Sequence, residues 1–370
     1  MSTNNTIDRR DFLKTSAGVA VAVAAASQLG ISYASSDGKS STKGKIKVSV
    51  NHEWGTLKDV MIGRMINGQL YVPEMTEGMK QEVDFIPRIA LDKMAANKGK
   101  LFVDVFPDFC KFWEPNTENF VNLVTDLGIK VHRNESLPVS EVKKIQPRYF
   151  GLQLYMRDPV LVIGNKVIVT NLKGPWRRVE RIAMKKILED IKQNYDAEII
   201  HMPEMKEGYD KGNIYLEGGD VLLNGYEIYV GNSGHASNKK GIDWLQETLG
   251  SRYKVHEIKQ RPDFLHLDCA MALLNEKFGI ICPDAITEKL PESLQDYEWV
   301  EATLEEAQVL GTNGCMLDRD TIITDDHHPR IAHELVLRGH HVIEIPYTQG
   351  QALGGGLRCS HHPLIRESKL

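Results

Sequence analysis

The fold is decided by a stretch that reads as a β-hairpin with an Asn-Gly turn, Val221-Leu222-Leu223-Asn224-Gly225-Tyr226-Glu227-Ile228-Tyr229-Val230. Apolar residues three and four positions apart then predict a helix over Lys239 to Leu249. A short alternating strand follows, from Tyr253 to Ile258. This order of hairpin, helix and strand predicts an α/β unit and argues against an all-β fold.

The same unit recurs along the chain, about five times at spacings of roughly 45 to 70 residues, as in radial arrays. We therefore expect a single α/β array closed around an axis, in which residues far apart in sequence meet at the centre. A second hairpin pattern covers residues 160–163 and 167–169. The other predicted helix and strand pairs are Asn116 to Leu127 with Ile129 to His132, Val179 to Tyr195 with Ala197 to Ile200, a weaker Pro291 to Tyr297 with Trp299 to Glu301, and Arg330 to Leu337 with His341 to Ile345.

One segment does not fit the repeat. Residues 72–113 contain a helical pattern from Thr76 to Asn97, followed by Gly99, Pro107 and several aromatic residues. We interpret this segment as a partly helical insertion that packs beside the array or over its mouth. The array itself is expected to be one domain over residues 48–370.

The N-terminal residues are not expected to belong to the fold. Arg9-Arg10 leads into an apolar run of small residues, and Ser32-Tyr33-Ala34 reads as a cleavage site. The paired arginines resemble a twin-arginine export signal, with Asp8 at a position usually held by Ser or Thr. The prediction is a signal over residues 1–34, a linker over 35–47, and delivery to the periplasm by the export machinery. The alternative is an uncleaved signal that anchors the protein in the membrane.

Composition limits the function further. The chain has 370 residues and a net charge of -5 with mixed signs, which suits a soluble enzyme and argues against nucleic acid as a partner. Its five cysteines form an odd set without close pairs, so disulfide staples are not expected. Three of them lie in apolar runs and are interpreted as core residues: Cys269, Cys282 and Cys315. Association into a homo-oligomer stays open.

A glycine-rich motif lies near the end of the chain, where Gly354, Gly355 and Gly356 precede Leu357-Arg358-Cys359. Glycines allow unusual backbone conformations and the close approach of another molecule, which would present the Cys359 thiol to a substrate. The alternative is a flexible C-terminal tail. The upstream chain must supply a base, an acid and a substrate anchor for the first interpretation to hold.

Charged residues interrupt three apolar strand patterns upstream, and buried charges need partners. They are Asp158 after Arg157, Glu217-Gly218-Gly219-Asp220, and His266 with Asp268, which are predicted to share one face of a strand. Singly they have ordinary alternatives: a turn, a bulge with solvated acids and a hydrogen-bonded core histidine. Together with a presented thiol they suit covalent chemistry on a planar cation, because carboxylates bind guanidinium through two parallel hydrogen bonds.

The order of these motifs along the chain resembles that of a known enzyme family. Asp158, Glu-Gly-Gly-Asp at 217–220, His266-Leu267-Asp268, Asn313-Gly314 and the terminal Gly-Gly-Gly-Leu-Arg-Cys stand in the order seen in guanidino-group-modifying enzymes. These are the arginine deiminases, dimethylarginine hydrolases and arginine:glycine amidinotransferases. The resemblance runs from about Val48 to Arg366, includes the opening Asn51 to Gly63, and implies a fivefold pseudosymmetric α/β propeller.

The resemblance implies a role for each matching residue. Cys359 is the expected nucleophile, His266 the general acid and base, and Glu217 the group that orients His266. Asp158 and Asp268 would bind the substrate guanidinium, and no cofactor or metal is needed. Further candidate substrate contacts are Asp220, Asn313, Arg157, Arg358, Gly355 and Gly356, and the candidates for holding a substrate carboxylate are Arg157, Arg177, Arg178, Arg330 and Arg358. Arg358 and His361-His362 are otherwise interpreted as loop residues.

The resemblance leaves two fates for the intermediate: water gives citrulline, and a second amine gives a new guanidino compound. The overall pattern is similar to amidinotransferases, which typically carry Asp-Ala-Ala-Asp where this chain has Glu-Gly-Gly-Asp, as the deiminases do. We therefore favour hydrolysis of a cationic guanidino substrate such as arginine. Two non-enzyme alternatives are a catalytically inactive guanidino-binding protein and an exported metal-binding protein. The second would use Asp325-Asp326 and the pairs His327-His328, His340-His341 and His361-His362.

Overall fold

The computed structural model describes residues 44–64, 70–74, 88–136, 140, 153–178, 180–206, 210–347 and 354–367. The predicted signal and most of the linker lie outside these residues, as does the first part of the helix predicted from Thr76. Over the part that is described, no helix combines the length and apolar character needed to cross a membrane.

Five three-stranded sheets of one topology make up the described fold. In each sheet the middle strand pairs antiparallel with one neighbour and parallel with the other. In sheet order they are β17 (His361–Glu367), β2 (Thr56–Ile62) and β3 (Lys130–Arg133); β4 (Val160–Ile163), β5 (Lys166–Val169) and β7 (Glu198–His201); β8 (Val221–Asn224), β9 (Glu227–Asn232) and β10 (Lys254–Lys259); β11 (Met271–Leu273), β12 (Phe278–Ile281) and β13 (Glu298–Glu301); and β14 (Cys315–Met316), β15 (Thr321–Asp325) and β16 (His341–Ile345). A further two-stranded sheet joins β1 (Ile46–Lys47) to β6 (Tyr195–Asp196).

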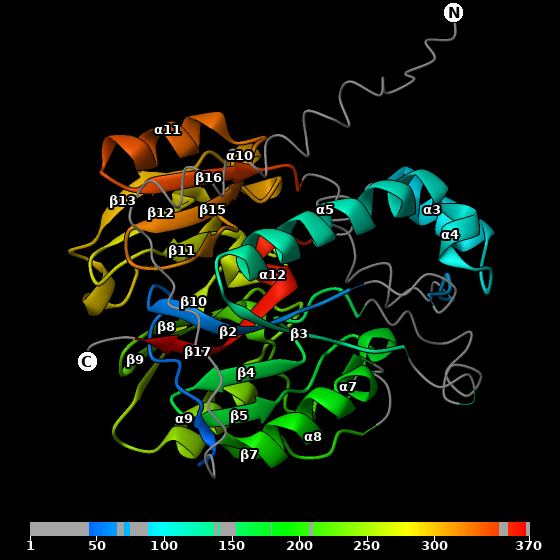
Figure 1. Cartoon of the computed structure of the whole chain (residues 1–370), viewed down its shortest axis with the longest axis horizontal. Helices are drawn as coiled ribbons and strands as arrows, with labels where there is room; N and C mark the ends of the chain where they lie inside the picture. Colours follow the sequence, from blue (N-terminus) through cyan, green and yellow to red (C-terminus); the bar gives the residue numbers. More distant parts are fainter. Residues whose placement is uncertain are drawn as a thin grey trace, which may run out of the picture.

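Helical segments connect the second and third strands of each sheet, because a parallel pair needs a crossover. Asn238 caps the crossover helix of the third unit by accepting a hydrogen bond from the Gly241 amide. The crossovers are α3 (Arg88–Ala96), α4 (Phe102–Val105) and α5 (Pro107–Asp126); α7 (Glu180–Ala183) and α8 (Lys185–Asn194); α9 (Lys239–Leu249); the 3-10 turns η4 (Pro283–Ala285) and η5 (Glu292–Leu294); and α11 (Pro329–Leu337). Figure 1 labels the α-helices among them. The remaining helical segments are η1 (Pro175–Arg177), η2 (Gly218–Asp220), η3 (Leu267–Cys269), α10 (Leu304–Gln308) and α12 (Leu357–Ser360).

The two ends of the described fold meet in one sheet. The C-terminal strand β17 pairs antiparallel with β2, with His361 opposite Ile62 and Glu367 opposite Thr56. Figure 1 shows these strands, red and blue, side by side at the middle of the molecule. The first unit is therefore completed by the last strand of the chain. This arrangement of five mixed sheets is consistent with the repeated units of the fivefold α/β propeller that the resemblance implies.

The predicted units are largely confirmed. Both hairpins form, and the helix over Lys239–Leu249 has the predicted bounds. The strand β4 is buried along its whole length, as its apolar sequence indicates.

Three local predictions were wrong. The helix expected to begin at Asn116 begins at Pro107 and contains Pro115, because its aromatic face packs into the core through Trp113 and Phe120. The weak helix over 291–297 is only the turn η5. The His266 segment is not a strand, since His266 precedes the 3-10 turn η3.

Candidate active site

The candidate site residues occupy equivalent positions in the five units. Each lies just before the outer strand that pairs antiparallel with the middle strand of its sheet. Asp158 precedes β4, Glu217 and η2 precede β8, His266 and η3 precede β11, Asn313 precedes β14, and Cys359 in α12 precedes β17.

Hydrogen bonds join these five segments into a closed ring. Each bond runs from one unit to the next, and the last returns to the second unit, so the segments surround a common centre. The bonds are Gly219 N to Asp158 Oδ1 at 3.0 Å, Leu267 N to Asp220 Oδ1 at 3.0 Å, Asn313 Nδ2 to the Asp268 carbonyl at 3.1 Å, Cys359 N to Asn313 Oδ1 at 3.2 Å, and Arg157 N to the Cys359 carbonyl at 3.0 Å.

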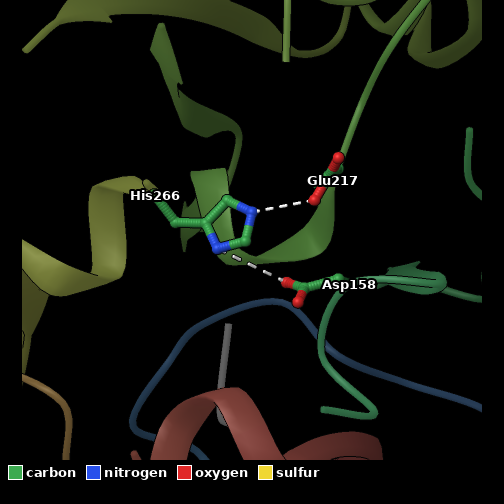
Figure 2. Close-up of side chains that lie close together, drawn as sticks. All are labelled: Asp158, Glu217 and His266. Carbon is green, nitrogen blue, oxygen red and sulfur yellow. Dashed lines mark hydrogen bonds and ion pairs between the residues drawn. The ribbon is translucent and has the colours of Figure 1, made fainter. Parts of the chain in front are cut away.

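His266 lies between two carboxylates, as Figure 2 shows. Its Nε2 is 2.9 Å from Glu217 Oε2, and its Nδ1 is 3.8 Å from Asp158 Oδ1. Burial alone would lower the pKa of His266, but the charges of Asp158, Glu217 and Asp220 outweigh it and raise that pKa well above its usual range. These charges therefore favour the protonated imidazole, which can act as an acid.

The Cys359 thiol contacts the carboxylate of Asp268. Its Sγ lies 3.6 Å from Oδ2 and 3.8 Å from Oδ1, and the side chain is buried. The neighbouring Cys269 thiol lies 3.6 Å from the same Oδ1. Cys269 was predicted as a core residue and is indeed buried, but it also borders the candidate nucleophile.

The side chain of Arg177 lies among the carboxylates that are candidates for binding the substrate guanidinium. Arg177 donates to Asp158 Oδ2 at 2.9 Å and to Glu217 Oε2 at 3.5 Å, and it pairs with both oxygens of Glu180 at 2.8 and 3.0 Å. Burial outweighs Arg177 and raises the pKa of Glu180 to about 7. The sequence analysis missed Glu180, although its i, i+3 spacing from Arg177 at the start of a helix was a usable signal.

A second buried guanidinium holds the nucleophile segment. Arg358 donates to Asp268 Oδ2 at 2.9 Å and to both oxygens of Glu53 at 3.0 and 3.2 Å. Burial would raise the pKa of Glu53, but Arg358 and Arg157 lower it below its usual range. Glu53 belongs to the opening motif of the resemblance, yet the sequence analysis gave it no role.

The residues flanking Cys359 are not a loop, which corrects the interpretation of Arg358, His361 and His362. Both histidines are buried in β17. His361 Nδ1 lies 2.7 Å from the Leu357 carbonyl, and the Val162 amide donates to His362 Nε2 at 3.0 Å. Burial and the charge of Arg157 lower the pKa of both histidines well below the usual range, so both are neutral packing groups.

Three glycines are required by close packing at the site. A Cβ on Gly219 would lie 2.6 Å from Nδ1 of His266, and a Cβ on Gly355 would lie 2.0 Å from the Tyr155 ring. Neither distance is compatible with a side chain. A Cβ on Gly356 would likewise meet Asn313 Oδ1 at 2.7 Å, so the glycine run brings α12 close to its neighbours.

The structure gives Asp220 backbone partners. Its Oδ1 accepts from the Leu267 amide and its Oδ2 from the Ser237 amide, both at 3.0 Å. We therefore propose that Asp220 positions η3, and with it His266, in place of the substrate contact suggested by the sequence. Asn313 has a comparable place, because it bridges Asp268 and Cys359.

Asp220→Asn is expected to lower the free energy of unfolding by about 1–3 kcal/mol, because the amide leaves one backbone N–H without an acceptor. Burial raises the pKa of Asp220 from 3.8 to about 7, so the native state binds an extra proton between these values and stability falls as pH rises through them. The variant should lose this part of the pH dependence. Urea unfolding at several pH values measures both effects, with the exposed Asp284→Asn as control. Unchanged unfolding curves would contradict the positioning role.

The remaining candidate arginines are Arg157, Arg178 and Arg330. Arg157 is buried and donates to the Arg358 carbonyl at 3.2 Å, whereas Arg178 donates to backbone carbonyls, including that of Leu172. Arg330 is paired with Glu306 at the surface.

Two groups of three side chains among the described residues have the spacing to hold a metal ion. The first is Asp158, Glu217 and His266, where the Arg177 guanidinium already supplies positive charge. The second is Asp325, Asp326 and His327. Of the six paired histidines, only His327 belongs to such a group within the described residues. The paired histidines therefore do not come together in one metal site there, as the metal-binding alternative would require.

Comparison with known proteins places the chain in a family. The model of the eukaryotic N,N-dimethylarginine dimethylhydrolases matches residues 116–321, and the model of twin-arginine translocation signals matches residues 6–26. The chain is 29% identical over 215 residues to the uncharacterized protein YkgA of Bacillus subtilis, covering 58% of this chain and 70% of YkgA.

Amidinotransferases are similar over a greater length. Inosamine-phosphate amidinotransferase 1 of Streptomyces griseus is 23% identical over 349 residues, which cover 85% of this chain and 95% of the relative. A solved structure of an inosamine-phosphate amidinotransferase from Streptomyces griseus has the same fold, with a TM-score of 0.73, 21% identity, and coverage of 87% and 98%.

A hydrolase structure is similar as well. It is a dimethylarginine dimethylaminohydrolase (DDAH) from Pseudomonas aeruginosa in complex with citrulline, with a TM-score of 0.57, 17% identity, and coverage of 83% of this chain and 99% of that chain. The twin-arginine signal indicates export. The family model spans more than half of the sequence, and the chain belongs to the dimethylarginine dimethylhydrolase and amidinotransferase family of guanidino-group-modifying enzymes.

Proposed function

We propose that this enzyme attacks the guanidino carbon of arginine, or of a close relative, with Cys359 and then hydrolyses the covalent intermediate. The observation that carries the proposal is the placement of the Cys359 thiol against Asp268, in one ring of segments with His266 between Glu217 and Asp158. The ring of hydrogen bonds also supports our proposal that residues 48–370 form one domain, a fivefold pseudosymmetric propeller. Export by the twin-arginine route supports a periplasmic location.

The carboxylates are suited to a cationic substrate. Asp158 and Asp268 each already accept a hydrogen bond from a buried guanidinium, at 2.9 Å in both cases. Burial would raise the pKa of Asp158, but His266 and Arg177 lower it below its usual range, so the group stays ionised. A carboxylate has about four acceptor positions, which leaves capacity for substrate N–H groups.

The chemistry then follows from the charges at the site. A bound guanidinium favours the Cys359 thiolate, which attacks the central carbon. The carbon–nitrogen bond to a terminal nitrogen breaks, and that nitrogen takes a proton from His266 and leaves as ammonia. Water then gives a proton to His266 and attacks the same carbon, and the carbon–sulfur bond breaks to release citrulline. Nδ1 of His266 suits the proton transfer, because its 3.8 Å separation from Asp158 is too long for a strong hydrogen bond.

Transfer to an amine is the second candidate function. The similarity to an amidinotransferase over 85% of this chain supports it. The dimethylhydrolase family model and the Glu-Gly-Gly-Asp sequence at 217–220 support hydrolysis. We favour hydrolysis because Glu217 directly contacts the proposed acid and base.

A product assay on the mature protein separates the two reactions. With arginine alone, hydrolysis is expected to release ammonia and citrulline in equal amounts. Agmatine and methylated arginines form the rest of the panel, with glycine and lysine as amine acceptors. Ornithine that appears only when an acceptor is present would reverse the assignment in favour of transfer.

A further inference from the structure

The cluster around Asp268 contains a second thiol that the proposed mechanism does not use. Cys269 Sγ and Cys359 Sγ both lie within 3.8 Å of Asp268 Oδ1, and both side chains are buried. The two residues are 90 positions apart in sequence and come from η3 and α12, in different units of the fold. A hydrogen bond with Cys359, together with burial, raises the pKa of Cys269 well above its usual range.

We propose that Cys269 is a resolving cysteine for Cys359, so that oxidation of the site ends in a reversible Cys269–Cys359 disulfide. The inference rests on the proposed function in one respect, namely that Cys359 is the reactive thiol of the site. Export supplies the setting, because twin-arginine export leads to a compartment where thiols meet oxidants.

Hydrogen peroxide is the oxidant considered, since it is small enough to reach a thiol that is only 2% exposed. The Cys359 thiolate attacks one peroxide oxygen, the oxygen–oxygen bond breaks, and Cys359 becomes a sulfenic acid as hydroxide leaves. Cys269 then attacks the Cys359 sulfur, the sulfur–oxygen bond breaks, and the hydroxyl leaves as water. Two thiols are thus oxidised to one disulfide while one peroxide is reduced to two waters.

Asp268 is placed to help the second step. Its Oδ1 lies 3.6 Å from Cys269 Sγ and can accept the thiol proton, which offsets the raised pKa of Cys269. Without Cys269 the sulfenic acid loses the thiol that shares Asp268 Oδ1 with it, and it continues to the sulfinic acid, which thiols do not reduce. Cys269 therefore decides whether oxidation of the site is reversible.

Peptide mapping by mass spectrometry tests the inference on the full mature protein. After treatment with hydrogen peroxide, the wild-type protein should lose two hydrogen atoms in mass and yield a linked peptide pair containing Cys269 and Cys359. Dithiothreitol should reverse both changes and restore the starting activity. Cys269→Ala should instead gain two oxygen atoms at Cys359, and dithiothreitol should not restore its activity.

Cys110→Ala is the matched control, because Cys110 is also buried but lies in α5. It should behave as the wild-type protein does. A wild-type protein that goes directly to the sulfinic acid, links Cys359 to another cysteine, or leaves Cys359 unoxidised would overturn the inference, and this result needs no variant. Turnover of arginine by untreated protein is measured in parallel. A disulfide without turnover would contradict only the proposed function, and turnover without a disulfide only the present inference.

Discussion

Cys359→Ser is expected to lower kcat by roughly 10³-fold or more, because a serine hydroxyl is a far weaker nucleophile than a thiolate at neutral pH. The protein should remain folded, since the backbone of Cys359 keeps its hydrogen bonds to Asn313 and Arg157. Initial rates of citrulline and ammonia release measure the loss, and thermal unfolding measures the fold.

Cys110→Ser serves as the control for this prediction. It changes the same atom in a buried cysteine of the helix α5 and should leave kcat close to the wild-type value, since Cys110 does not belong to the ring of segments that holds the reacting groups. Turnover by Cys359→Ser near the wild-type rate would remove Cys359 from the mechanism.

His266→Ala should lower kcat by roughly 10²- to 10⁴-fold, the range for the loss of a general acid and base. The pH dependence is the more specific readout. Asp158, Glu217 and Asp220 together outweigh the effect of burial and raise the pKa of His266 well above 6.5. The wild-type rate should therefore fall on the alkaline side as His266 loses its proton, and this alkaline limb should be absent in the variant.

The raised pKa of His266 also makes the stability of the folded protein depend on pH. A histidine whose pKa is raised on folding stabilises the protein fully below its unfolded pKa, and this stabilisation is lost as pH rises through the folded pKa.

His327→Ala is the control for the pH dependence of the rate, because Asp325 and Asp326 outweigh burial and raise the pKa of His327 as well, outside the proposed site. An alkaline limb that disappears in both variants, or in neither, would contradict the role of His266.

Periodicity was sufficient to predict most of the fold. The apolar hairpins and the helix over 239–249 have local patterns that tertiary contacts did not override. Helix α5 begins nine residues before the predicted start at Asn116 and contains Pro115, and packing of Trp113 and Phe120 in the core compensates for that proline. The pairing of β17 with β2 joins residues about 300 positions apart and leaves no local signal.

The site was predictable in its residue types but not in its partners. Asp158, Glu217, His266 and Asp268 were recognisable as polar residues inside apolar patterns. Their internal partners were not, because an ion pair across units has no fixed spacing in sequence. Thus Arg358 seemed a loop residue, although it holds Asp268, and the ring of hydrogen bonds became visible only in three dimensions.

The central claim is that the guanidino carbon becomes covalently bound to Cys359, and the mass of the adduct during turnover tests it most directly. Acid quenching within the first turnover with arginine, followed by mapping of the Cys359 peptide, should reveal arginine less ammonia attached to the sulfur. An amidino group alone on the sulfur would still identify Cys359 as the nucleophile, but it would indicate transfer in place of hydrolysis. Product formed in the first turnover while the Cys359 peptide stays unmodified at every time point would contradict the account.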